Sequence, residues 1–425
     1  MSRADLRAFG ARTFRSLHIR NYRLFFIGQL ISVSGTWMQT VAQSWLVLNL
    51  TGSGVDLGIT VALQFVPMLF FGLWGGLLAD RCDKRKLLVV TQLAGALLAL
   101  ALFALVATHT VELWMVYVLA FLLGVVTMVD MPTRQSFVIE MVGPEDVPNA
   151  VGLNSAMYNS GRILGPAAAG VIIATLGIAP AFLANAISFL AVIAALIAMR
   201  PEELYRRERS ERQRGEVRAG LRYVWADPTL RSTLFLVAVL GLFGFNFIVV
   251  LPLLAKFTFS GGAGLYSLFT SLMSLGSLTG ALYAASRARP TRRVLIGAGI
   301  AFGALLLATS VAPTAWLTCV LLVPTGMAVM LFLATANTTL QLGSDPAMRG
   351  RVMALYGLLF LGSTPVGGPL LGWISEAWGP RFGLGLGGAI SLAAAVAAAS
   401  RVGLRRRAGE GAPAGGEAPE VIVAA

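Results

Sequence analysis

The sequence contains few of the side chains from which metal sites, disulfide frameworks and hydrolytic centres are built. Its 425 residues include only two cysteines, Cys82 and Cys319, and two histidines, His18 and His109. Two cysteines so far apart supply neither a disulfide framework nor a zinc ligand set. A Gly-x-x-x-x-Gly-Lys-Ser/Thr phosphate-binding loop is also absent. We therefore expect no metal, no cofactor and no enzymatic activity, and we do not expect ATP to drive the protein.

Charged residues are scarce as well. Only 12% of the residues are Asp, Glu, Lys or Arg, and 56% are hydrophobic, whereas a soluble domain carries about 25% charged residues. So few charges cannot cover so much apolar surface in water. The composition predicts an integral membrane protein and excludes a cytosolic enzyme, a disordered chain and a secreted disulfide scaffold. The net charge of +13 does not indicate nucleic-acid binding, because the basic residues are spread over loops between apolar segments.

Twelve apolar stretches have about the length, 20 residues, that a membrane-spanning helix needs. They run over Leu24–Leu48, Leu57–Leu78, Leu87–Ala107, Leu113–Met131, Val151–Ile173, Ala179–Met199, Leu234–Leu254, Leu265–Ala285, Val294–Ala312, Ala315–Ala336, Val352–Ile374 and Phe382–Ala399. A membrane β-barrel would instead show alternating segments of about 10 residues. We predict an all-α integral membrane protein with twelve transmembrane helices.

The basic residues orient these spans. Of the 33 Lys and Arg residues, 30 lie in segments on one side, Lys256 and Arg381 lie on the other side, and Arg162 lies within a span. The positive-inside rule places the basic side, with both termini, in the cytoplasm. The first 23 residues show no signal-peptide pattern, so the first span is expected to be the anchor. The prediction is a multi-pass protein of the cytoplasmic (inner or plasma) membrane.

Two internal repeats indicate a duplicated chain. Gly76-Leu-Leu recurs as Gly280-Ala-Leu after 204 residues, and Gly165-Pro recurs as Gly368-Pro after 203 residues. We predict two pseudo-symmetric six-helix halves, 24–199 and 232–402, joined by a cytoplasmic loop, 200–231. An N-terminal cytoplasmic segment, 1–23, and a disordered cytoplasmic tail, 403–425, flank them. Such halves are typical of transporters that alternate access to a site near the midplane.

Two motifs stand out within the first half. One runs from Gly76 through Asp80, Arg81 and Lys84 to Lys86. Gly76 allows helices to approach closely, and Asp80 either bonds a neighbouring helix or is a solvated residue of a plain basic loop. The other motif lies in the fifth span, and its members are Gly152, Gly161, Gly165, Pro166, Ala169 and Gly170. A spacing of four residues aligns its small side chains on one face, and Pro166 is expected to kink the helix; the alternative is ordinary small-residue packing.

The chain resembles the major facilitator superfamily of transporters in these two motifs. The Asp80 motif is similar to the signature loop between helices two and three, and the span-five pattern is similar to the antiporter motif of exporters. Further stretches resemble a bacterial exporter subgroup that includes the enterobactin exporter and macrolide or drug efflux proteins. These stretches are Arg20–Phe25, Gly35–Gln39, Leu50–Ser53, Asp130–Gln135 and Arg349–Val352. The resemblance covers roughly residues 14–402 and implies the major facilitator fold.

The resemblance also implies roles for charged residues. Asp80, Lys84 and Asp130 correspond to a cytoplasmic charge relay that holds the halves together in one state, with Arg81 and Arg134 beside them. In many relatives the counterpart of Asp80 faces the start of helix eleven, near Val352 here. From its position at the cytoplasmic end of the fourth span, Asp130 is expected to form a structural pair with Arg134 or with the basic loop, and Glu140, after that span, is expected to be a solvated or capping residue. Many proton-coupled relatives carry an Arg where this chain has Ala120.

Polar side chains inside the spans are candidates for substrate or ion binding. Arg162 lies near mid-depth, where it either meets an anionic group in a cavity or serves a structural role. Gln29, Thr36, Gln39 and Gln43 share one face of the first span and either line the cavity or make interhelical hydrogen bonds. Weaker candidates are Asn154, Tyr158, Asn246 and Asn337.

These observations predict a monomeric secondary transporter that exports a small amphipathic or apolar molecule, such as a drug, siderophore or secondary metabolite. The expected mechanism is alternating access with proton antiport, since moving one charge through 100 mV supplies about 2.3 kcal/mol. Importers, facilitators and lipid flippases of the same fold are alternatives, as is a membrane sensor that does not transport.

Overall fold

The computed structural model describes residues 14–205, 217–286 and 291–410. Throughout this part of the chain the regular elements are helices, without a strand. The helices of the first half are α2 (Arg20–Thr51), α3 (Gly54–Arg81), α4 (Lys84–Ala107), α5 (Leu113–Leu176) and α6 (Ala179–Ala198). Those of the second half are α8 (Pro228–Gly244), α9 (Phe247–Leu253), α10 (Ala263–Ala285), α11 (Arg292–Ser310), α12 (Ala315–Leu342), α13 (Pro346–Trp378) and α14 (Pro380–Glu410). The predicted all-α membrane fold is confirmed.

The described helices account for the twelve predicted spans. Ten are long and apolar enough to cross a membrane. One of these, α5, comprises two spans, because Gly143 leaves the helical conformation (φ 71°, ψ 170°) and Pro144 follows it. The helix α2 is not among the ten, although its 32 residues are long enough to cross. Its many polar residues lower its hydropathy, and they lie largely inside the bundle.

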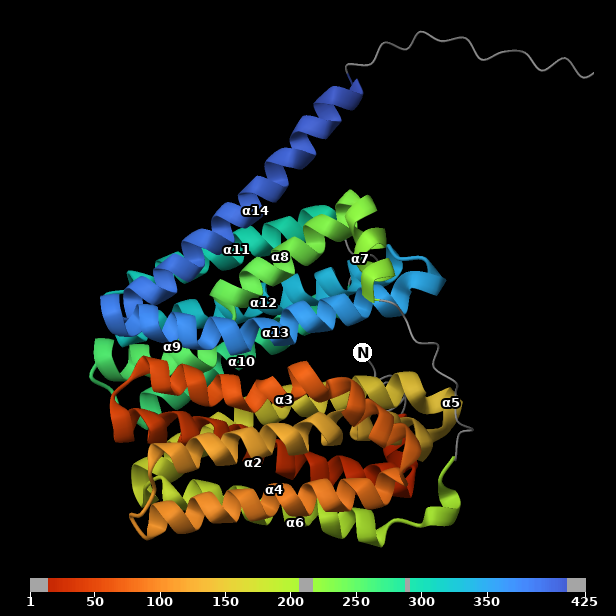
Figure 1. Ribbon diagram of the computed structural model, residues 1–425, viewed down its shortest axis with the longest axis vertical. Coiled ribbons are helices and arrows are strands. Elements are labelled where there is room, and N and C mark those ends of the chain that lie inside the picture. Colours follow the sequence, from red (N-terminus) through yellow and green to blue (C-terminus); the bar gives the residue numbers. More distant parts are fainter. Residues whose placement is uncertain (1–13, 206–216, 287–290, 411–425) are drawn as a thin grey trace, which may run out of the picture.

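The helices form two bundles that share a packing scheme (Figure 1), with α2–α6 in one and α8–α14 in the other. A Cβ added to Gly124 would lie 2.4 Å from the carbonyl oxygen of Gln64 on α3. In the second bundle, a Cβ added to Gly326 of α12 would lie 2.0 Å from the carbonyl oxygen of Met273 on α10. In both bundles a glycine thus allows the close approach of two helices.

The first span of the second half is interrupted rather than continuous. The predicted span Leu234–Leu254 lies within Pro228–Thr258, which is long and apolar enough to cross a membrane, but α8 ends at Gly244 and α9 begins at Phe247. The Asn246 side chain occupies the break and donates to the carbonyl oxygens of Gly241 (3.3 Å) and Leu242 (2.8 Å). An amide that satisfies freed helix carbonyls stabilises such a break. A short π-helix, η3 (Leu254–Thr258), completes the span.

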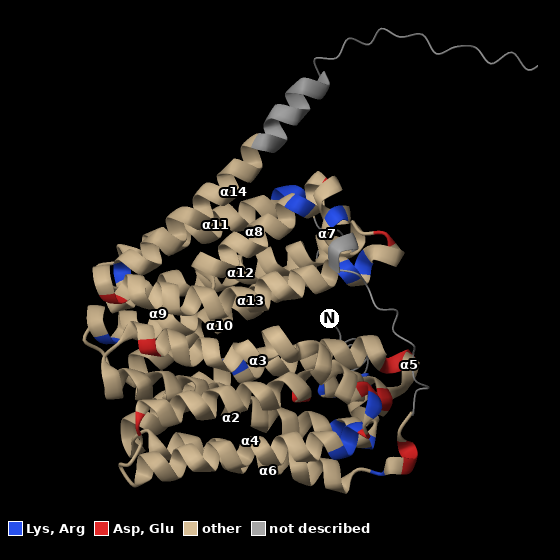
Figure 2. Cartoon of the chain, viewed as in Figure 1, with Lys and Arg blue, Asp and Glu red and all other residues tan. Residues whose placement is uncertain are grey.

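Charges are concentrated at one end of the molecule (Figure 2). This end, called the basic end below, carries the end of α3 with Arg81 and the start of α4 with Lys86, and also Arg200 and Arg349. The opposite end, called the far end, carries Lys256 and Arg381. The intervening length of the helices is nearly free of charge, which fits a protein whose middle lies in hydrocarbon.

The connecting and terminal segments differ in part from expectation. Within the predicted central loop, α7 (Val217–Ala226) is a helix, and Tyr223 of α7 donates from its hydroxyl to Asp345 (3.1 Å). At the other end of the chain, α14 continues to Glu410, so residues 403–410 of the predicted disordered tail are helical; Ala and Arg are good helix formers. Residues 1–13, 206–216 and 411–425, on which the remaining terminal and loop predictions fall, lie outside the described residues.

Candidate functional site

The two bundles contact each other near the far end. A Cβ added to Gly58 of α3 would lie 2.6 Å from the carbonyl oxygen of Gly368 on α13, and α5 meets α10 where Gly170 packs on Ser267. The Ser271 hydroxyl donates to the carbonyl oxygen of Ile163 (3.3 Å), also across the two bundles. The far end is therefore closed in this conformation.

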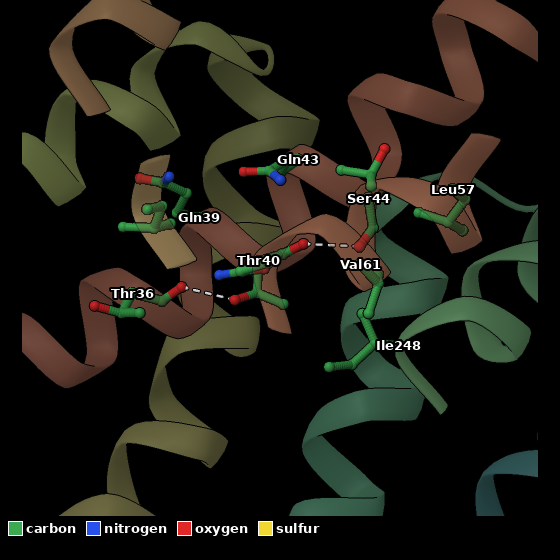
Figure 3. Close-up of a pocket in the computed structure, with 11 residues that line it drawn as sticks. Thr36, Gln39, Thr40, Gln43, Ser44, Leu57, Val61 and Ile248 are labelled. Atoms are coloured by element: carbon green, nitrogen blue, oxygen red, sulfur yellow. Dashed lines mark hydrogen bonds between the residues drawn. The ribbon is translucent and has the colours of Figure 1, made fainter. Parts of the chain in front are cut away.

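A small polar pocket lies between the bundles. It has a volume of about 20 Å³, space for one water molecule, and Figure 3 shows its lining. The lining residues are Thr36, Gln39, Thr40, Gln43 and Ser44 of α2, Leu57, Thr60, Val61 and Gln64 of α3, Leu123 of α5 and Ile248 of α9. All of them except Ile248 come from the first half of the chain, and every polar side chain among them is uncharged. The pocket can offer hydrogen bonds and apolar contacts to a ligand but no ion pair.

Of the predicted polar face of α2, three residues line this pocket: Thr36, Gln39 and Gln43. Gln39 also accepts a hydrogen bond from the Asn185 side chain on α6 (2.5 Å). It therefore both lines the pocket and makes an interhelical hydrogen bond, the two roles predicted as alternatives for this face. Gln29 lies elsewhere. It is fully buried, and neither its amide nitrogen nor its amide oxygen has a partner among the described residues.

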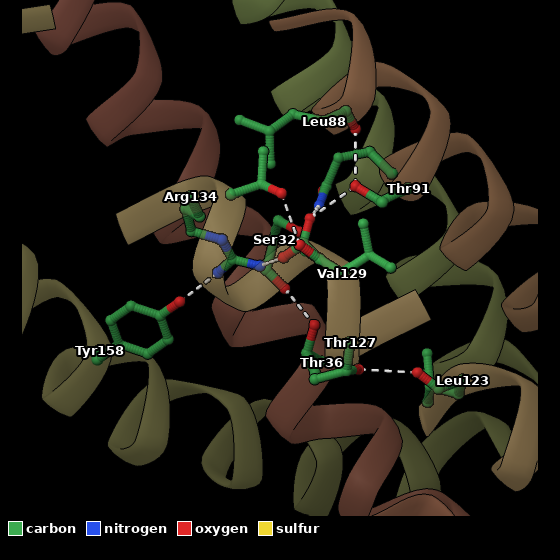
Figure 4. Close-up of polar contacts among 12 residues, drawn as sticks. Ser32, Thr36, Leu88, Thr91, Leu123, Thr127, Val129, Arg134 and Tyr158 are labelled. Atoms are coloured by element: carbon green, nitrogen blue, oxygen red, sulfur yellow. Dashed lines mark hydrogen bonds and ion pairs between the residues drawn. The ribbon is translucent and has the colours of Figure 1, made fainter. Parts of the chain in front are cut away.

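A buried charge network surrounds Asp130 (Figure 4). Arg134 donates both to Asp130 and to the Tyr158 hydroxyl. From α4, the Thr91 hydroxyl (2.8 Å) and the Gln92 amide (2.7 Å) also donate to Asp130. Asp130 is 4% exposed, so its charge depends on these donors in place of water. The network joins α4 to both segments of α5, which lie on either side of Gly143.

The predicted relay residues Asp80, Arg81 and Lys84 lie together on a separate cavity of about 670 Å³ at the basic end. Lys84 forms an ion pair with Glu140 (2.5 Å), and both side chains are about 85% buried, with 16% and 14% exposed. The expectation that Glu140 is a solvated or capping residue is therefore wrong, because the chain folds it back against the α3–α4 loop. Val352 is buried in an apolar cluster of the second half.

The close helix contact expected at Gly76 occurs one residue earlier. A Cβ added to Gly75 would lie 2.3 Å from the carbonyl oxygen of Met128 on α5, whereas Gly76 is half-buried. Since neighbouring residues differ by about 100° around a helix, the two glycines point in different directions, and sequence alone did not distinguish them.

Replacing Lys84 by methionine is expected to lower the free energy of unfolding by about 1–3 kcal/mol, more than for an exposed ion pair and less than for a fully buried one. The freed Glu140 carboxylate borders the 670 Å³ cavity and can be hydrated there. Melting of the purified protein in detergent, with the parent chain as reference, measures this. A loss as large as that caused by removing Asp130 would contradict the hydration argument.

The span-five motif packs against both bundles. Cβ atoms added to Gly161 and Gly165 would lie 2.6 Å from the Val33 side chain and 2.4 Å from the carbonyl oxygen of Ser34, both on α2. Pro166 and Ala169 are buried beside them, and Gly170 faces Ser267 of α10. Gly152 differs, since nothing lies within 4 Å of an added Cβ there. The motif's glycines thus serve close packing at the centre of the molecule, with Gly152 outside that contact.

Arg162 is placed on the same segment of α5. Its guanidinium lies over the ring of Trp37 on α2, 5.2 Å from the ring centroid, and its Nε atom is buried without a partner. Among the described residues it forms no ion pair. A cation–π contact of this kind holds the side chain in place without neutralising its charge.

The remaining candidates are scattered. Asn154 is half-buried on α5, and Asn246 fills the α8–α9 break. Asn337 accepts from Gln341 of its own helix (2.5 Å). The structure does not gather these three into the pocket.

Sequence reasoning missed several polar partners. Gln64 and Thr60 line the pocket, Gln92 holds Asp130, and Asn185 bonds Gln39. Each of these side chains is an amide or hydroxyl inside an apolar run, where polar residues are scarce. The search for polar residues inside a span was applied systematically only to the first span. Extending it to the second, third and sixth spans would have found these four residues.

Comparison with known proteins agrees with this geometry. Residues 11–423 match the transmembrane secretion effector family. The chain belongs to this family. It is a membrane transporter of the major facilitator type and not an enzyme, as the sequence predicts.

Among curated relatives of this family member, the multidrug efflux pump Tap of Mycolicibacterium fortuitum is 29% identical over 84% of this chain and 89% of that protein. The staphyloferrin A transporter of Staphylococcus aureus is 26% identical over 61% of this chain, and the match spans 66% of that protein's length. Among solved structures, an inward-facing bacterial homologue of the lysosomal transporter Spinster has a TM-score of 0.70 at 14% identity, covering 91% of this chain and 96% of that one. The nucleoside transporter NupG has a TM-score of 0.69 at 12% identity, covering 90% and 99%. These structures share the fold.

Proposed function

We propose that the protein exports a small amphipathic or apolar molecule by alternating access, with protons as the coupling ion. The observation that carries this proposal is the uncharged polar pocket that the first bundle lines together with Ile248 of the second. In the described conformation the pocket has room for about one water molecule, so a ligand would enter it only when the bundles separate. Its amides and hydroxyls would then bind the polar groups of the ligand, and Leu57, Val61 and Ile248 would contact the apolar part. The efflux function named for the Tap relative supports the direction of transport.

The basic end would face the cytoplasm in this proposal, with both termini there and the far end facing outward. The positive-inside rule supports this orientation. The described conformation, closed at the far end, would then receive its ligand from the cytoplasm or the inner leaflet. A monomer suffices, because both walls of the pocket come from one chain.

Export of a fluorescent amphipathic dye from energised cells that overexpress the protein tests the proposal. Extrusion that stops when a protonophore collapses the gradient is the expected result. Gln43→Leu should reduce extrusion by removing a polar group of the pocket, whereas Gln341→Leu, outside the pocket, should not.

Each alternative predicts a different outcome of this experiment. Dye accumulation in place of extrusion would indicate an importer, and flux unaffected by the protonophore would indicate a facilitator. Transfer of labelled lipid in vesicles, without dye flux, would indicate a flippase. Ligand binding without any vectorial flux would indicate a sensor.

Asp80→Asn is expected to slow conformational cycling and to leave ligand affinity unchanged. Asp80 lies on the basic-end cavity with Arg81 and Lys84 and not on the polar pocket, so removing its charge alters the electrostatics of the basic end and leaves the ligand-binding groups in place. Turnover and the binding constant are measured separately in proteoliposomes. A changed binding constant at unchanged turnover would count against the relay role.

A further inference from the structure

The turn between α2 and α3 lies at the far end, and two charged side chains of the second half hold it. The Lys256 ammonium, on η3, donates to the carbonyl oxygen of Leu48 (2.6 Å) and to the Asn49 side chain (3.2 Å). These acceptors belong to the last turn of α2, which ends at Thr51. The carbonyl end of a helix carries partial negative charge, so a cation is favoured there.

The other side of the turn is held by an acid. One carboxylate oxygen of Glu376, in the last turn of α13, accepts from the Ser53 hydroxyl (2.8 Å) and from the backbone N–H of Val55 (3.1 Å). Ser53 is the N-cap of α3 and also accepts from the Asp56 N–H (3.2 Å). The amide end of a helix carries partial positive charge, so an anion is favoured there.

At each of the two helix ends, the charged side chain has the sign opposite to the partial charge of the helix end. The second half places a cation on the carbonyl end of α2 and an anion on the amide end of α3, with only Gly52 and Ser53 between the two helices. An interface fixed only by apolar packing would need neither charge. Reversing the conformation has to separate each charge from its helix end, because the α2–α3 turn belongs to one half and both charges belong to the other.

We propose that Lys256 and Glu376 form a clamp that keeps the far end closed by capping the two helix ends of the α2–α3 turn. The clamp sets the balance between the far-end-closed and far-end-open states and leaves the ligand pocket itself unchanged. The inference rests on the alternating-access part of the proposed function, but not on substrate or coupling ion.

Maleimide labelling of a buried reporter tests the clamp. In a Cys82→Ser, Cys319→Ser background, Ser267→Cys places one thiol on α10 where it faces Gly170 of the other half; Ser267 is 2% exposed. A membrane-impermeant maleimide reaches this thiol only when the far end opens. Lys256→Met and Glu376→Gln are each expected to raise its labelling rate about three- to tenfold, since each removes charge-assisted hydrogen bonds.

Matched controls make the result specific. Arg381→Gln removes another far-end charge of the second half, but Arg381 donates to the carbonyl oxygen of Ala312 within that same half (2.7 Å), so labelling should not change. Lys256→Arg keeps the cation and should label like the parent. Thr110→Cys, an exposed far-end position, should label equally fast in every variant and reports correct folding and insertion.

Parent-like labelling of the Ser267→Cys reporter in both Lys256→Met and Glu376→Gln would overturn the clamp. An equal increase in Arg381→Gln would overturn it too, because far-end charge in general would then be responsible. The labelling needs no substrate or gradient. Clamp-dependent labelling in a protein that exports nothing would therefore refute the proposed export and leave the clamp standing.

Discussion

Asp130→Ala is expected to cause the largest loss of stability of any single change considered, about 3–5 kcal/mol, because it leaves a buried cation without its counterion. The substitution removes the acceptor shared by Arg134, Thr91 and Gln92. Arg134 would keep only the Tyr158 hydroxyl, and its side chain is 15% exposed. Thermal melting in detergent and the yield of folded protein in membranes measure the effect.

A double substitution separates the charge effect from the shape effect. Asp130→Leu combined with Arg134→Met removes both charges and should be more stable than Asp130→Leu alone, since replacing both members of a buried pair costs less than orphaning one. Asp130→Asn alone should also destabilise, because one amide oxygen cannot serve three donors. Additive losses in the double variant would show that the pair is not coupled.

The membrane class and the course of the helices could be predicted because both follow from hydropathy and length. The breaks inside helices could not. Gly143 lies between the predicted fourth and fifth spans, but Asn246 interrupts an apolar run that hydropathy predicts as one span, and the sequence offers glycine, proline and asparagine at many other positions that remain helical. Which one breaks the helix depends on the packing around it.

The sequence predicted that a polar pocket would lie beside α2, but it predicted only some of the residues that line it. The polar face of α2 indicated a pocket, and Thr36, Gln39 and Gln43 line it. Gln29 fits the same helical face but is buried elsewhere, because a face of a long helix passes different neighbours at different depths. The pairing of Lys84 with Glu140 required the fold, since 56 residues separate them.

The same limit applies to the far end. Glu376 and Ser53 are 323 residues apart, and each is unremarkable in its own segment. Lys256 stood out in the sequence only as a basic residue on the sparsely charged side. The contact of both charges with one turn arises from the way the two halves meet, which no local pattern encodes.

Arg162→Ala is expected to lower the transport rate at least tenfold, with little effect on the amount of protein in the membrane. A tenfold loss of rate corresponds to about 1.4 kcal/mol of activation free energy. The guanidinium is held over Trp37 and has no ion-pair partner among the described residues. A positioned cation without a counterion in the hydrocarbon region is costly, and its retention is explained if it meets an anionic group of a ligand or a coupling acid during the cycle.

Two conservative variants distinguish this role from packing. Arg162→Met keeps an apolar stem against Trp37 and removes the charge, so it should transport as poorly as Arg162→Ala if the charge matters. Arg162→Lys keeps the charge without the planar guanidinium and should retain part of the activity. Near-normal flux in Arg162→Met, measured as initial rates in proteoliposomes at equal protein content, would make Arg162 a structural residue, and the uncharged pocket would then have to select its ligands through amides, hydroxyls and apolar contacts alone.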